Sequence, residues 1–267
     1  MKSTGLLLLI GLVVIILQLS RYANTFMPVN IINLDRSHDR LQSMSLLCHL
    51  YGLPFHRHPA VDGNTYEYTD KEKDLLFGLA LRRQDNIKIQ EFRHTPQERL
   101  TLYTKWEKEK TFKKTKRVMA CSLSHIQVWQ RYAKSADPYI MVLEDDGKFN
   151  SHIRQHVNTC VRRLDAFDPE WHIVWLSGKD PKDREQVIHW NAYNVYRMNP
   201  PEYVGQGAGA YILSKKGIRH FLKVLEEGCW HPADIFLFKT LSKEHSYGVH
   251  PPLVDIHHNT TVSTIAF

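Results

Sequence analysis

Residues 139–146 read Tyr-Ile-Met-Val-Leu-Glu-Asp-Asp, an apolar run that ends in three consecutive carboxylates and is followed by Gly147. A short, partly β-branched apolar run of this kind predicts a buried strand. The acids then lie where a central strand leaves an α/β sheet at its carboxyl end, which is the usual place for ligands in such folds. Because strand side chains alternate in direction, Glu144 and Asp146 are expected to share a face while Asp145 points away.

Two carboxylates on one face indicate a candidate site for Mg²⁺ or Mn²⁺, since these ions prefer carboxylate and phosphate oxygens and can carry a diphosphate. An acidic turn after a strand is the simpler interpretation of an isolated Glu-Asp-Asp sequence. The choice between a metal site and a plain turn therefore depends on what the rest of the chain supplies.

The chain around this strand predicts one α/β domain with a mostly parallel central sheet. Residues 29–34 read as a strand, residues 41–51 as a helix that stops at Gly52, and residues 53–57 as a second strand. This β-α-β opening favours parallel strands with helices packed on the sheet. Further strands are expected at 173–176, near 187–197, at 207–213 and just before Pro251.

Serines mark the expected starts of two helices in the second half of the chain. Ser122 is expected to cap a helix that carries Leu123, Ile126 and Trp129 on one face, and Ser214 to cap another. Further helices are expected in the 150s and 160s and at about 232–241.

The basic charge of the chain is concentrated in one segment. The formal net charge is +7, and residues 105–117 hold seven Lys or Arg against two Glu. This segment belongs to a polar stretch, about 64–119, that we interpret as an insertion in the domain. It is either a solvated face or a surface that attracts an anionic substrate or membrane. No nucleic-acid-binding motif accompanies it, so nucleic acid is not an expected partner.

The N-terminus predicts a membrane anchor. Gly5 to Leu17 is unbroken by polar side chains, with Lys2 before it and Arg21 after it. We interpret residues 1–23 as a retained signal anchor of a single-pass type II protein, with residues 24–267 translocated to the ER or Golgi lumen in a eukaryote. The four cysteines show no zinc-binding spacing, and they could form disulfides or remain buried thiols.

Four short motifs follow one another in a recognisable order. They are Ile32-Asn33-Leu34-Asp35-Arg36 with Asp39-Arg40, Ala60-Val61-Asp62-Gly63, Ala120-Cys121-Ser122-Leu123-Ser124-His125, and Leu143-Glu144-Asp145-Asp146. This series resembles glycosyltransferase family 25, which contains lipopolysaccharide and lipooligosaccharide galactosyltransferases and collagen hydroxylysine galactosyltransferases. The resemblance covers about residues 29–263.

The resemblance implies a GT-A type fold, a nucleotide-sugar donor, a divalent metal ion (Mn²⁺ or Mg²⁺) and inversion at the anomeric carbon. The expected reaction moves a hexose, in the first place galactose, from a UDP-sugar to a hydroxyl of a glycan, a lipid-linked saccharide or a protein. The alternative is a protein of the same fold that has lost turnover and binds glycans or stabilises a partner.

Several residues then receive expected roles in donor binding. Asp146 is the expected metal ligand, and Glu144 is expected to act on the metal or on the ribose. Arg36 and Arg40 follow the first strand, where guanidinium groups can hold a diphosphate bidentately. The alternative for both arginines is a surface ion pair with Asp35 or Asp39.

The expected helix after Ser122 would place Ser124 and His125 in a first turn, where a donor phosphate is favoured. The alternative is a helix cap and a structural histidine. The resemblance also assigns Asp62 to substrate binding.

An inverting transfer needs a general base for the acceptor hydroxyl, and Asp234 is the expected one. Its alternative role is that of a carboxylate stabilised at a helix N-terminus. Asp255, His257 and His258 are candidates for one further metal ligand, with His257 preferred.

Overall fold

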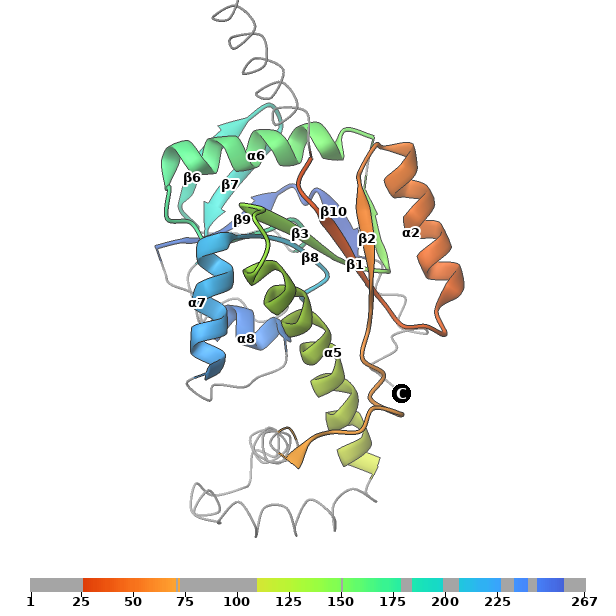
Figure 1. The fold of residues 1–267 in the computed structure, drawn as a ribbon. Coiled ribbons are helices and arrows are strands. Elements are labelled where there is room, and N and C mark those ends of the chain that lie inside the picture. Colours follow the sequence, from red (N-terminus) through yellow and green to blue (C-terminus); the bar gives the residue numbers. More distant parts are fainter. Residues whose placement is uncertain are drawn as a thin grey trace, which may run out of the picture.

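The computed structural model describes residues 26–70, 72, 110–149, 151–178, 184–198, 207–226, 233–239 and 244–256. They form a mixed eight-stranded sheet with helices on both faces, and a separate two-stranded sheet (Figure 1). The expected anchor, residues 1–23, and most of the expected insertion lie outside the described residues. None of the helices in the described ranges has the length and apolar composition needed to cross a membrane.

Three neighbouring parallel strands form one side of the large sheet. β1 (Val29–Asn33) lies between β2 (Phe55–Pro59) and β3 (Tyr139–Glu144), and both neighbours run parallel to it. The register pairs Asn33 with Pro59 and Ile32 with Glu144, so all three strands end close to one another. The expected β-α-β opening and the strand that precedes the acids are confirmed.

The other side of the sheet is largely antiparallel. β8 (Ala210–Ser214) runs antiparallel between β3 and β5 (Ile173–Trp175), and β9 (Ser246–His250) then runs parallel to β5. The β6–β7 hairpin (Gln186–Trp190 and Tyr193–Arg197) lies beyond β9 and forms the edge of the sheet opposite β2. The small sheet pairs β4 (Gly147–Phe149) with β10 (Val254–Ile256). The expectation of a mostly parallel sheet therefore holds for β2, β1 and β3, while the complete sheet is mixed.

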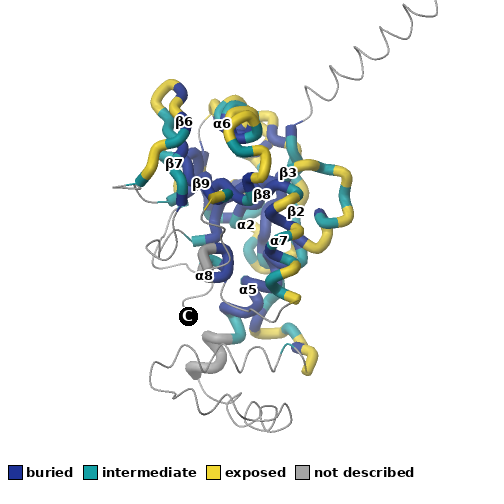
Figure 2. The backbone as a smooth tube through the Cα atoms, turned by 90° about the vertical axis from the view of Figure 1, so that its left-hand side faces the viewer, coloured by how far each residue is buried: buried dark blue, intermediate teal, exposed yellow. Residues whose placement is uncertain are grey.

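Successive side chains of the central strands point in opposite directions and pack into two hydrophobic cores. Met141 and Leu143 of β3 pack in one core with α2 (His38–Leu50) and α6 (Ile153–Phe167). Ile140 and Val142 point the other way, into a second core with α5 (Lys110–Ala133), α7 (Lys215–Glu226) and α8 (Ala233–Lys239). Figure 2 shows β3, β8 and β9 buried between these helical layers. The period-two burial explains why this strand is apolar throughout.

Helix α5 starts earlier than the sequence suggested. We expected a helix capped by Ser122, but α5 is continuous from Lys110, and Ser122 lies in its middle. The Ser122 hydroxyl donates back to the carbonyl of Val118 at 3.1 Å, as mid-helix serines do. Val118 and Met119 are buried, so the apolar face of the helix extends upstream of the expected cap. The expected cap at Ser214 is confirmed, because its hydroxyl accepts the N–H of Gly217 at 3.0 Å.

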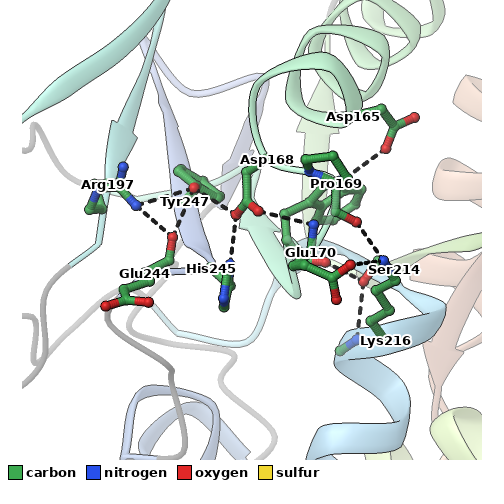
Figure 3. A network of polar contacts seen from close by, with 12 residues as sticks. Asp165, Asp168, Pro169, Glu170, Arg197, Ser214, Lys216, Glu244, His245 and Tyr247 are labelled. Atoms are coloured by element: carbon green, nitrogen blue, oxygen red, sulfur yellow. Dashed lines mark hydrogen bonds and ion pairs between the residues drawn. The ribbon is translucent and has the colours of Figure 1, made fainter.

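A polar network ties the C-terminal end of α6 to β9 (Figure 3). The Asp168 carboxylate accepts the hydroxyl of Tyr247 at 2.8 Å and lies 2.9 Å from Nδ1 of His245. Burial acts to raise the pKa of Asp168, but the hydrogen bonds from His245 and Tyr247 outweigh it and hold that pKa below its usual value.

Candidate active site

A cleft opens at the carboxyl ends of β1, β2 and β3, beside the middle of α5. Each of these strands ends in polar residues that reach it, and parallel strands bring such residues to one edge of a sheet. The residues that line the cleft are Ile32, Leu34, Arg36, Arg40, Ala60, Val61, Asp62, Gly63, Arg117, Cys121, Ser124, His125, Glu144, Asp145 and Asp146. The structure thus brings together Arg36, Arg40, Asp62, Ser124, His125, Glu144 and Asp146, which the sequence had nominated from four separate segments.

Both nominated arginines are held by carboxylates of the cleft. Arg36 forms an ion pair with Asp62, and Arg40 Nη2 lies 3.1 Å from Asp145 Oδ1. The partners considered from the sequence, Asp35 and Asp39, are thus not the ones that face these arginines. Arg36 and Arg40, together with Arg117, are the cationic residues that line the cleft.

Asp145 is the buried acid of the trio. Its Oδ2 accepts a hydrogen bond from Asn33 Nδ2 at 2.6 Å, which joins the ends of β3 and β1. The same amide group donates to the carbonyl of Ser37 at 3.0 Å. Asn33 Oδ1 in turn accepts Arg57 Nε at 3.0 Å. Asp145 therefore holds the ends of β3 and β1 together, although it lines the cleft beside Glu144 and Asp146 and does not point away from it.

Asp146 carries an electrostatic penalty. Burial, followed by the charges of Glu144 and Asp145, raises the pKa of Asp146 to about 6. Its Oδ1 is buried and meets no hydrogen-bond donor among the described residues. An unpaired carboxylate oxygen among other acids fits a divalent cation, since the cation would relieve the repulsion and supply the missing partner. Glu144 and Asp146 therefore suit an ion of the Mg²⁺ or Mn²⁺ class.

Ser124 and His125 line the cleft, but from the middle of α5, so the expected helix N-terminus is wrong. The backbone N–H groups there are used within the helix and do not face a ligand. Ser124 donates to the carbonyl of Ala120 at 2.8 Å and accepts the N–H of Val61 at 2.8 Å. It thereby holds the loop after β2 against α5.

His125 joins the cleft to the core. Its side chain is 0% exposed and its Nε2 lies 3.4 Å from Oε1 of Glu144, whose side chain is 28% exposed. Its Nδ1 lies 2.8 Å from the hydroxyl of Tyr211, and that hydroxyl accepts Trp129 Nε1 at 3.0 Å.

Asp234 lies in the first turn of α8, as expected, but not among the residues that line the cleft. Burial raises the pKa of the Cys121 thiol well above its usual value, and the charges of Glu144, Asp234 and Asp146 add to that rise, so the charge of Asp234 acts on this cleft residue. Asp255 is exposed on β10 opposite Lys148, at the small sheet. His257 and His258 lie outside the described residues.

Sequence reasoning gave no role to four residues that shape the site: Asn33, Arg117, Cys121 and Tyr211. Asn33 is a polar residue inside an apolar strand, which is a signal for a buried hydrogen bond. Cys121 precedes His125 by four residues, which places both on one helix face. Tyr211 had no local signal, because its role depends on β8 lying beside β3.

An α/β fold with a cleft at the carboxyl ends of parallel strands defines a broad class of proteins that bind ligands at this edge of the sheet. Within that class the chain belongs to glycosyltransferase family 25 (LPS biosynthesis protein), whose sequence model matches residues 26–237. The resemblance stated from the motifs is confirmed.

Individual relatives are distant. A protein from Bos taurus named probable inactive glycosyltransferase 25 family member 3 is 26% identical over 127 residues, 46% of this chain and 20% of that protein. Procollagen galactosyltransferase 1-B of Xenopus laevis is 26% identical over 125 residues, with the same two shares, 46% and 20%. The lacto-N-neotetraose biosynthesis glycosyltransferase LgtB of Neisseria gonorrhoeae is 26% identical over 136 residues, 45% of this chain and 44% of that protein.

The matched segment thus spans less than half the length of each of these three relatives. Among solved structures, a glycosyltransferase involved in the glycosylation of the major capsid of PBCV-1 superposes with a TM-score of 0.40 and 8% identity, over 88% of this chain and 94% of that chain.

Proposed function

We propose that this protein transfers a hexose, with galactose as the first candidate, from a UDP-sugar to an acceptor hydroxyl, with a divalent metal ion and inversion at the anomeric carbon. The observation that carries the proposal is the meeting of Arg36, Arg40, Glu144 and Asp146 in one cleft. The arginines come from the β1–α2 junction and the acids from the end of β3, more than a hundred positions apart. The cleft pairs cationic groups for a diphosphate with acids for a cation.

The donor would lie between the two sides of the cleft. Arg36 and Arg40 would exchange part of their contact with Asp62 and Asp145 for phosphate oxygens, a pairing to which guanidinium groups are well suited. Glu144 and Asp146 would hold Mn²⁺ or Mg²⁺, which supplies Lewis-acid stabilisation of the departing diphosphate. The raised pKa of Asp146 favours this role, because a bound cation would restore the ionised carboxylate.

Asp234 is the proposed general base. Its carboxylate would take the proton of the acceptor hydroxyl while the hydroxyl oxygen attacks the anomeric carbon and the bond to the diphosphate breaks. UDP then leaves and the product has inverted configuration. Acceptors of three kinds fit this chemistry: a glycan, a lipid-linked saccharide or a protein hydroxyl.

A panel of UDP-sugars with the full chain and Mn²⁺ tests the proposal. We expect Mn²⁺-stimulated turnover of one sugar, a loss of at least about 100-fold with Asp146→Asn or Asp234→Asn, and normal turnover with the exposed control Glu67→Gln. Unchanged turnover in Asp146→Asn would refute the metal role. Unchanged turnover in Asp234→Asn would refute the base.

A second candidate function is a protein that keeps the donor site without turnover. The reason to consider an inactive protein is the relative from Bos taurus whose name calls it probably inactive. Calorimetry separates the two: metal-dependent UDP binding without turnover of any UDP-sugar would support an inactive binder, and turnover would exclude it.

We also propose that residues 1–23 anchor the protein as a single-pass type II membrane protein with the cleft on the lumenal side. The uninterrupted apolar stretch from Gly5 to Leu17 supports this. Carbonate extraction and protease protection of the full chain test it. Release by carbonate, or digestion of the domain in intact vesicles, would contradict it.

A further inference from the structure

The cleft holds a set of three metal-ligand residues, of which the proposed transfer uses only Glu144. Cys121 and His125 lie one turn apart on α5, and Glu144 faces them from the end of β3. The thiol sulfur, an imidazole nitrogen and a carboxylate oxygen all lie within 4.8 Å of one another. Sulfur, nitrogen and oxygen together form a softer ligand set than the two carboxylates expected to hold Mn²⁺.

The orientation of His125 is fixed by buried partners. Its Nδ1 lies 2.8 Å from the Tyr211 hydroxyl, which already accepts the indole N–H of Trp129 at 3.0 Å. In the tautomer with the proton on Nδ1, that hydroxyl accepts both N–H groups and Nε2 presents its lone pair to the cleft. Histidines that bind metal ions almost always have their second nitrogen held in this way.

The observed spacing suits two ligands of one tetrahedral ion. Bond lengths of about 2.0–2.2 Å from zinc to nitrogen and oxygen separate the two ligand atoms by about 3.4 Å. Nε2 of His125 and Oε1 of Glu144 are 3.4 Å apart. A zinc–sulfur bond of about 2.3 Å requires the Cys121 sulfur to lie about 3.6 Å from either atom. The Cys121 sulfur lies within 4.8 Å of both ligand atoms, so it is close to the spacing that a three-ligand site requires.

We propose that Cys121, His125 and Glu144 bind Zn²⁺, or another thiophilic divalent ion such as Co²⁺, at a site that shares Glu144 with the oxygen-ligand site. Binding replaces the thiol proton by a sulfur–metal bond, and the proton leaves to solvent. The fourth position faces the cleft, where water or Asp146 can fill it. We propose that Glu144 binds one ion at a time and does not bridge two, so that Zn²⁺ and Mn²⁺ exclude each other. This exclusion, unlike the thiolate site itself, rests on the proposed function.

Cobalt titration of the reduced full chain tests the thiolate site directly, since cobalt bound to a thiolate gives a near-ultraviolet charge-transfer band. We expect the band in the wild-type protein and in Cys160→Ser, a matched control whose thiol lies on the buried face of α6. We expect Cys121→Ser to lack it, with Cys121→Ala as the replacement if the serine variant melts early. Tyr211→Phe should weaken cobalt binding by about 10- to 100-fold. No band in the wild type, or a band retained without the Cys121 thiol, would overturn the site.

Electron paramagnetic resonance of free Mn²⁺ tests the exclusion. Zn²⁺ should release bound Mn²⁺ from the wild type and should not do so from Cys121→Ser at the same concentration. Simultaneous binding of both ions would overturn the exclusion. A cobalt band in a protein that binds no Mn²⁺ supports the thiolate site and counts against the proposed donor site. Binding of Mn²⁺ and UDP without a cobalt band would support the proposed donor site and overturn the thiolate site.

Discussion

Replacing Asp146 by Asn should stabilise the metal-free protein. The carboxyl group has its pKa raised from 3.8 to about 6, by burial first and then by Glu144 and Asp145. A rise of one pH unit in a pKa corresponds to about 1.4 kcal/mol, so keeping this side chain ionised in the fold costs at most about 3 kcal/mol. Partial solvent access reduces that figure, and we expect Asp146→Asn to raise the unfolding free energy by about 1–3 kcal/mol at pH 7.5.

The sign of the pH dependence follows from the direction in which folding moves this pKa. A carboxyl group whose pKa is raised by folding destabilises the protein above that pKa and is neutral below its unfolded value. The advantage of Asp146→Asn should therefore be full above about pH 6.5 and should fall to about 0.5 kcal/mol at pH 4. Urea unfolding of the full chain in EDTA at several pH values measures it.

Mn²⁺ should make the wild type more stable than Asp146→Asn, which is the reverse of the order expected in EDTA. If Glu144 and Asp146 hold Mn²⁺ as proposed, the ion stabilises the folded wild type by mass action, while Asp146→Asn lacks one ligand and gains less. Glu67→Gln, an exposed carboxylate in the loop after β2, serves as the control and should change the unfolding free energy by less than about 0.5 kcal/mol. The reasoning fails if Asp146→Asn is less stable than the wild type in EDTA at pH 7.5, or if its effect does not vary with pH.

Three further substitutions test the surroundings of the cleft and the far side of the sheet. Ser124→Ala should lower stability by about 1 kcal/mol and raise KM for the donor, because the loop after β2 loses its bond to α5; unchanged values in melts and kinetics would contradict this. Gly63→Ala should lower the melting temperature, because a Cβ there would lie 2.7 Å from the Cα atom of Arg117, and a melting temperature equal to that of the wild type would refute that close approach. Asp168→Asn should cost about 1–2 kcal/mol at pH 7, because its carboxylate accepts the Tyr247 hydroxyl. Its lowered pKa means that this loss should shrink as the pH falls below about 4, and a loss that stays constant in urea unfolding would contradict the network.

The sequence was informative where structure is decided locally. The apolar run from Tyr139 to Leu143 predicted a strand buried on both faces, and its alternating side chains do enter two cores. The serine at 214 predicted a cap that the structure contains. Motif order also selected the residues that line the cleft.

What the sequence did not reveal depends on contacts between distant segments. A serine at a cap and a serine that bonds back within a helix look alike in sequence, so Ser122 was assigned the wrong position. The direction of β8 follows from its pairing with β3 and β5, and no local pattern encodes it. The Tyr211 hydroxyl reaches His125 only because of that pairing.

The route from β2 to β3 has an evolutionary consequence. Two parallel strands on either side of β1 need a crossover of only about a dozen residues, and the 24 residues of α5 are already sufficient for it. The chain between Glu72 and Lys110 is therefore not needed to span this crossover, so we expect its length to vary among relatives that keep the sheet register. Chimaeras joined at these two positions should therefore keep the fold, and a measured change in their acceptor preference would show whether this stretch contributes to acceptor choice.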